Sequence, residues 1–217
     1  MQQKTYGYGR NFTEPGSSGT TFVPGLNRVK MTSIKVEDEV EWGTYKGPAV
    51  VAEWTNEEGD VQDGSVTPPK PGSSEKDQRR DFGNVNGWIK HLITAFISDE
   101  DYNAKIEELL NGNPGPSFKQ YMEYNISLLP PDYTQKWGLL KCGYDAYSEE
   151  YLRVPKYINI GCFFALQGET REGHTVDEEF KSKGFRKEPF PLAERKDKQS
   201  KLAQEAPAIE QKTEVNF

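Results

Sequence analysis

The chain has 217 residues, a hydrophobic fraction of 34% and a formal net charge of -7. This length favours one domain with appendages, and the low hydrophobic fraction leaves part of the chain outside any core. The acidic balance argues against a generally basic nucleic-acid binder but leaves room for a local basic groove. No apolar run follows the N-terminal residues, and no stretch approaches the ~20 apolar residues of a membrane helix. We therefore expect a cytoplasmic protein without membrane contact.

The N-terminal part of the chain predicts a flexible arm and then a series of strands. Residues 1–19 are rich in Gly, Ser, Asn and Thr, which is typical of an arm. Alternation of apolar and polar residues and turn-forming residues then indicate strands with short connections. The expected elements are a turn at Pro24-Gly25, a strand over Val29–Val36, a turn at Lys46-Gly47-Pro48, a strand over Ala49–Trp54, a hairpin loop at Asn56–Asp60 and a return strand at Val61–Val66.

The middle of the chain predicts three helices after an exposed loop at residues 67–77. Apolar residues at three- and four-residue spacing indicate an amphipathic helix over Asn84–Ile97. Ser98 with Asp101 resembles a capping box for a second helix, which Gly112 closes. Ser117 opens a third helix that ends before two prolines. Together these helices form an insertion at about residues 84–129.

Strands return after the helices, and the chain then becomes polar. Strands are expected over Lys136–Tyr144, Tyr151–Val154 and Tyr157–Leu166, and residues 169–217 are expected to form a largely disordered tail. The domain would then span 20–168. This order favours a mixed β/α fold, an oligonucleotide-binding (OB)-like five-stranded β-barrel with a helical insertion between strands. An α+β sheet with helices on one face is the alternative.

Residues that could support catalysis or bind a metal are sparse. His91 is expected on a helix surface and His174 in a loop, and neither has a spacing typical of a zinc site. Cys142 and Cys162 read as buried, reduced thiols. The sequence contains no phosphate loop and no nucleophile elbow. We therefore predict a protein without cofactor, metal or catalytic residue, with an enzyme of unrecognised type as a less favoured alternative.

The segment Lys136–Leu166 interleaves cations with aromatic residues, which is the combination that single-stranded DNA requires. Cations follow the phosphates, and aromatic rings stack on unpaired bases at ~1–3 kcal/mol per base. Aromatic residues at these positions could equally fill a barrel core, and the charge run before the first helix could be a solvated face. The candidate phosphate ligands are Lys141, Arg153 and Lys156, with Arg79 and Arg80 in a second patch; the stacking candidates are Trp137, Tyr144 and Tyr157, with Trp42, Tyr45 and Trp54 as weaker ones.

Two short motifs within residues 20–166 resemble those of phage-encoded single-stranded-DNA-binding proteins of the OB-fold type. The first motif comprises Phe22, Pro24, Gly25, Val29 and Ile34; the second comprises Lys141, Tyr144, Tyr151, Leu152, Pro155 and Tyr157. The resemblance implies a non-catalytic role in phage DNA replication or recombination in the host cytoplasm. It also implies a tail whose terminal aromatic, here Phe217, contacts replication proteins, although this tail contains few acidic residues. Self-association stays open.

A virion structural or protein-interaction component is the main alternative function. The Gly-rich arm and the polar tail would suit segments that become ordered only on assembly. Such a protein would polymerise or dock on a capsid partner without affinity for DNA.

Overall fold

The computed structural model describes residues 21–42, 45–70, 72–111, 116–145, 152–155, 163–167 and 185–189. The predicted arm and most of the predicted tail lie outside these ranges. So do several residues singled out from the sequence: Lys156, Tyr157, Cys162, His174 and Phe217.

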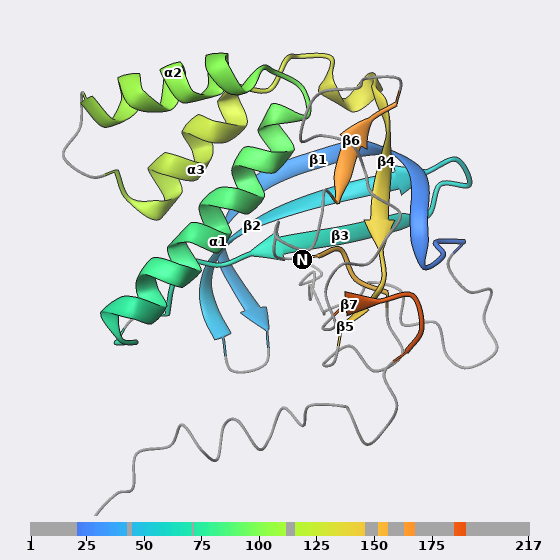
Figure 1. Cartoon of the computed structure of the whole chain (residues 1–217), viewed down its shortest axis with the longest axis horizontal. Helices are drawn as coiled ribbons and strands as arrows, with labels where there is room; N and C mark the ends of the chain where they lie inside the picture. Colours follow the sequence, from blue (N-terminus) through green and yellow to red (C-terminus); the bar gives the residue numbers. More distant parts are fainter. Residues whose placement is uncertain are drawn as a thin grey trace, which may run out of the picture.

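An antiparallel five-stranded sheet forms the centre of the described chain (Figure 1). Its order is β3 (Val61–Val66), β2 (Tyr45–Asn56), β1 (Gly25–Trp42), β4 (Trp137–Cys142) and β6 (Phe164–Leu166). Within the described residues no hydrogen-bonded pairing joins β3 to β6, so the sheet is not closed and the predicted OB-like five-stranded barrel is not confirmed. The mixed β/α class and the position of the helices between strands are confirmed.

Strand β1 is 18 residues long and curves as it crosses the sheet. It pairs with β2 along most of its length and with β4 only over Gly25–Lys30. Its register with β2 shifts between Met31 and Ser33 and again between Glu37 and Val40. Such irregularities bend a strand and increase its twist. Strand β1 is therefore a bent central strand, with β2 on one edge and β4 on the other.

The predicted turn at Lys46-Gly47-Pro48 is wrong, because these residues belong to β2. Trp42 lies directly opposite Tyr45, and their ring centroids are 6.4 Å apart. The chain therefore reverses between these two residues, ahead of the Gly-Pro pair. Cross-strand aromatic contact stabilises a hairpin, and here it outweighs the local preference of Gly-Pro for a turn. The predicted loop at Asn56–Asp60 and the strand Val61–Val66 are confirmed.

Three helices connect β3 to β4 and lie together on the left in Figure 1. They are α1 (Glu75–Thr94), α2 (Asp99–Asn111) and α3 (Phe118–Ser127), followed by the short 3-10 helix η1 (Tyr133–Gln135). The predicted caps are confirmed, since Asp101 N donates to Ser98 Oγ and Gln120 N donates to Ser117 Oγ. Helix α1 begins nine residues earlier than predicted, because Ser74 caps a charged first turn that has no apolar periodicity.

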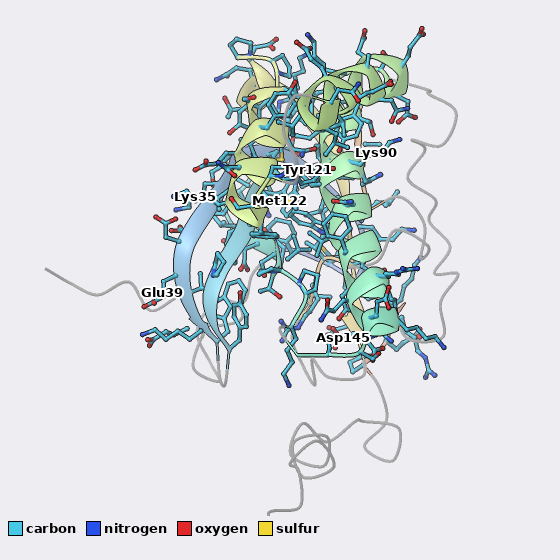
Figure 2. The ribbon with its side chains drawn as sticks, turned by 90° about the vertical axis from the view of Figure 1, so that its left-hand side faces the viewer. Lys35, Glu39, Lys90, Tyr121, Met122 and Asp145 are labelled. Atoms are coloured by element: carbon cyan, nitrogen blue, oxygen red, sulfur yellow. The ribbon has the colours of Figure 1, made fainter. Side chains whose placement is uncertain are left out.

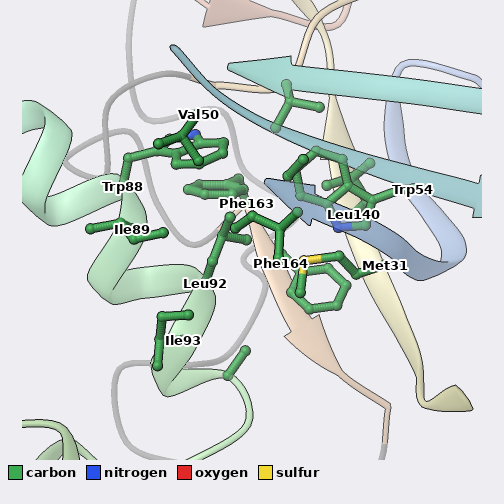
Figure 3. Packing of buried hydrophobic residues seen from close by; sticks show 14 of the residues in the cluster. Met31, Val50, Trp54, Trp88, Ile89, Leu92, Ile93, Leu140, Phe163 and Phe164 are labelled. Carbon is green, nitrogen blue, oxygen red and sulfur yellow. The ribbon is translucent and has the colours of Figure 1, made fainter. Parts of the chain in front are cut away.

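The core lies between α1 and one face of the sheet (Figure 3). Trp88, Leu92 and Ile93 of α1 are buried against strand residues such as Met31 and Leu140. Figure 2 shows Tyr121 and Met122 of α3 directed towards α1, whereas Lys35 and Glu39 of β1 point outward. This face of the sheet is therefore filled by apolar side chains.

His91 is buried, which corrects the prediction of a helix-surface residue. Its side chain is 6% exposed, and its ring centroid lies 4.5 Å from that of Phe163. The backbone N–H of Phe164 donates to His91 Nε2 at 3.3 Å. An imidazole nitrogen that accepts a hydrogen bond carries no proton. His91 therefore links α1 to β6 within the core.

Cys142 is a buried free thiol, as predicted. Burial raises the pKa of this thiol well above its ordinary value, so the folded protein retains a proton that the unfolded chain loses near pH 8.5. The stabilising contribution of the buried, protonated thiol is complete below that pH and is lost as pH rises.

We expect the free energy of unfolding to fall about 2 kcal/mol more between pH 8 and pH 10 in the native protein than in Cys142→Ala. Urea unfolding under reducing conditions measures this difference, and equal falls would contradict it.

A short strand lies within the segment predicted as a tail. Strand β7 (Phe185–Arg186) pairs with β5 (Tyr144–Asp145), so Tyr144 lies opposite Arg186. Phe185 is 2% exposed. A single buried aromatic residue anchors this segment, although the sequence around it is too polar to predict a strand.

Candidate nucleic-acid interface

The two faces of the β1–β4 pair have opposite chemistry. Val29 and Leu140 point to the core, while the intervening residues point away from it. Lys30 lies directly opposite Trp137 in the register, and Arg28 lies opposite Leu139. Residues directly opposite each other in an antiparallel pair share one face. Arg28, Lys30 and Trp137 therefore lie together on the face that α1 does not cover, and we call these three residues the Trp137 cluster.

Both cations of the Trp137 cluster are close to the indole ring. Arg28 Cζ lies 4.5 Å from the ring centroid, and Lys30 Nζ lies 4.8 Å from it. Cations within about 6 Å of an aromatic centroid are attracted by its quadrupole. The Trp137 side chain is half-buried, so part of the ring remains in contact with solvent. An aromatic surface is thus held beside two positive charges.

The two cations differ in their other partners. Arg28 forms an ion pair with Glu57 through Nη1 and donates from Nε to Gln167 Oε1 at 2.9 Å. Lys30 has no carboxylate partner in the part of the chain that the structure describes. Lys30 is therefore the cation of this cluster that can take a phosphate without breaking an ion pair.

Two of the residues predicted to contact DNA are fully buried. Lys141 and Trp54 each have 0% exposure. Trp54 belongs to the core-facing side of β2, where its ring lies 6.2 Å from that of Phe164. Trp54 faces the core, whereas Lys141 alternates with the core-facing Leu140 and so lies on the same face of β4 as Trp137, where it is covered. Neither residue has surface to offer a ligand. Neither residue is therefore part of the candidate interface.

A second group of basic and aromatic residues lies at the far end of β4. Tyr144 is half-buried opposite Arg186. Arg153 is joined to Gly143 by reciprocal backbone hydrogen bonds of 3.0 and 2.7 Å. Lys187 Cε lies 4.0 Å from where a Cβ on Gly25 would stand. Two predicted residues, Tyr144 and Arg153, are thus brought together with two cations that sequence reasoning missed.

The remaining predicted residues lie away from β4. Arg79 pairs with Glu75, and Arg80 pairs with Asp77 and Asp81, all on the first turns of α1. That end of α1 is at the lower left of Figure 1, and β4 is at the right. Trp42 is at the opposite end of β1 from Arg28. These residues do not join the Trp137 cluster.

Acidic residues mark the neighbouring part of the same sheet face. Glu53 of β2 lies directly opposite Asp63 of β3. Lys30 is paired with Thr55, and Glu53 lies two residues before Thr55 on β2. Glu53 therefore lies on the same outer face of the sheet as Lys30. Two carboxylates at this position disfavour a phosphate backbone. The positive part of the face is therefore limited to β1 and β4.

Sequence reasoning did not single out Arg28 and Lys30 as candidate binding residues. The available signal was their two-residue spacing between Asn27, Val29 and Met31, which places both cations on one side of a strand. The register that pairs β4 with β1, and so places Trp137 beside these two cations, could not be predicted from the sequence.

The described residues contain no group of three or more His, Cys, Asp or Glu side chains arranged to hold a metal ion. None of the described helices combines the length and apolar character needed to cross a bilayer.

No protein-family model, curated protein or solved structure matches the chain.

Proposed function

We propose that this protein binds single-stranded DNA without sequence preference, on the outer face of β1 and β4. The observation that carries the proposal is the Trp137 cluster, a partly exposed indole with two cations within 5 Å on the face away from α1. Stacking uses the π-face that every base has, and the cations neutralise phosphates. This combination favours tolerance of sequence over readout of base edges.

The strand order supports an OB-like architecture for the proposed function. The order β4-β1-β2-β3, with a long connection from β3 to β4, is that of a Greek key. The OB fold is a five-stranded, partly open Greek-key barrel that binds oligonucleotides on one face. We propose that β6 serves as its fifth strand.

The segment 152–155 supports a barrel-like closure at the open side of the sheet. Arg153 bridges to Gly143 at the end of β4. A Cβ built on Gly64 of β3 would lie 3.3 Å from Val154 Cβ. This segment therefore reaches from β4 to β3, and the absence of a side chain at Gly64 makes room for Val154.

The distribution of charge favours a DNA path along β4. The Trp137 cluster lies at the start of β4, and Tyr144 with Arg153, Arg186 and Lys187 lies beyond its end. The carboxylates of Glu53 and Asp63 oppose a path across β2 and β3. Lys141, between these two groups on the outer face of β4, is fully buried, so a single strand would contact the aromatic and basic residues at the two ends of β4 and not its middle.

The test is fluorescence anisotropy of a labelled ~30-nucleotide oligo(dT) and of a duplex of equal length, each titrated at about 50 mM and 200 mM salt. We expect tight binding of the single strand, weaker binding at the higher salt, and little binding of the duplex. Absence of single-strand binding at 50 mM salt would refute the proposal and leave the virion or interaction role as the function to pursue.

A further inference from the structure

Glu57 occupies the position on Arg28 that a phosphate would need. Asn56 is paired with Val29 in an antiparallel register, so the next residue, Glu57, lies opposite the preceding residue, Arg28. The two side chains form an ion pair, with 41% of the Arg28 side chain and 50% of the Glu57 side chain exposed to solvent. A carboxylate and a phosphate oxygen bind a guanidinium through the same N–H donors. The ion pair is exposed to solvent, so a DNA phosphate could reach Arg28 and compete with Glu57 for it.

The turn that carries Glu57 is held in place by its own hydrogen bonds. Asn56 N donates to Asp60 O at 3.0 Å, and Asp60 N donates to Asn56 Oδ1 at 2.8 Å. Gly59 has a φ of +88°, which glycine adopts without strain. Thr21 N donates to Asp60 Oδ2 at 2.6 Å from outside the turn. Glu57 is therefore presented to Arg28 by a fixed support.

We infer that Glu57 is an internal competitor that holds Arg28 away from DNA and sets the affinity and salt dependence of the proposed site. The inference rests on the proposed function. In the free protein, Arg28 is engaged by Glu57 and Gln167 beside the Trp137 ring. A phosphate that binds Arg28 displaces the carboxylate of Glu57, while Lys30 accepts a phosphate directly.

Displacement of Glu57 alters the ion balance of binding. Each phosphate contact on a single strand releases condensed cations and contributes about 0.7 to the slope of log affinity against log salt. The freed carboxylate attracts cations in turn and offsets part of that release. Removing its charge should therefore increase both the affinity and the steepness of the salt dependence.

Glu57→Gln tests the inference, with Glu58→Gln as the matched control. Glu58 is the next residue of the same exposed turn, and its carboxylate lies 3.5 Å from Thr21 Oγ1. We expect Glu57→Gln to bind oligo(dT) about three- to five-fold more tightly at 50 mM salt, the size expected of an exposed ion pair. Its salt slope should be steeper by up to about 0.7. Glu58→Gln should bind like the native protein.

The same substitution in an Arg28→Ala background separates local competition from a general loss of negative charge. We expect Glu57→Gln to have no effect on affinity there, because the group that it releases is absent. Equal tightening in both backgrounds would overturn the inference. Unchanged affinity of Glu57→Gln, in a protein that binds oligo(dT), would overturn it and leave the proposed function standing. If the native protein does not bind oligo(dT), the proposed function and this inference fail together.

Discussion

Gly138→Ala is expected to destabilise the fold by about 3 kcal/mol, the upper part of the range for overpacked cores. A Cβ at this position would lie 2.7 Å from the carbonyl oxygen of Ala165 and 2.7 Å from the ring of Phe164. Gly138 pairs with Leu166 on one side and with Val29 on the other, so the backbone is fixed between two strands. Neither β1 nor β6 can move aside without losing its pairing with β4. Urea unfolding of the native protein and the variant measures the effect.

Gly83→Ala is the matched control for this substitution. Gly83 is an exposed residue of α1, and a Cβ there would meet nothing within 4 Å. Alanine is favoured over glycine in a helix by about 0.5–1 kcal/mol. The same chemical change should therefore stabilise the protein at one position and destabilise it at the other. A loss below about 0.5 kcal/mol at Gly138, which is the usual effect of a surface substitution, would contradict the packing described for β4 and β6.

Elements whose signals are local could be predicted from the sequence. The caps at Ser98 and Ser117 depend on residues within one helical turn, and both helices begin there. The strand Val61–Val66 follows a turn whose hydrogen bonds are made by Asn56 and Asp60 themselves. In each case the contacts that fix the element lie within a few residues of it.

Elements that depend on distant contacts were predicted wrongly or missed. Tyr45 pairs with Trp42, and this cross-strand contact moves the hairpin away from the Gly-Pro pair. His91 is buried because Phe163 and Phe164, more than 70 residues later, pack on α1. The residues around His91 in the sequence do not indicate these contacts, and a single polar histidine in a helix suggests a surface position.

The candidate site shows the same division between local and distant signals. Trp137 was identified from the sequence because aromatic and basic residues alternate around it. Arg28 and Lys30 were not, because their proximity to Trp137 depends on the pairing of β1 with β4. Lys141 shares the pattern of Trp137 but is completely buried. Residue type therefore indicated which side chains to consider, and strand pairing and burial showed which of them lie together on an exposed face.

Trp137→Ala is expected to weaken binding of oligo(dT) by about 5- to 150-fold, which corresponds to the ~1–3 kcal/mol of one stacked base. The loss arises because the substitution removes the ring on which a base would stack and also the surface that orients Arg28 and Lys30. Trp137→Phe should recover part of the affinity, since a smaller ring still stacks. Thermal unfolding of each variant establishes that the loss is not due to unfolding.

Phe82→Ala and Lys105→Ala are the controls that make this result specific to the Trp137 cluster. Phe82 is an aromatic residue of α1 with 49% exposure, and Lys105 is an exposed cation of α2. Neither should alter the affinity for oligo(dT), whereas Lys30→Ala should lower the salt slope by about 0.7 because one phosphate contact is lost. If Phe82→Ala weakens binding as much as Trp137→Ala, DNA binds on the helical side of the protein. The outer face of β1 and β4 would then be the wrong surface, although single-strand binding itself would stand.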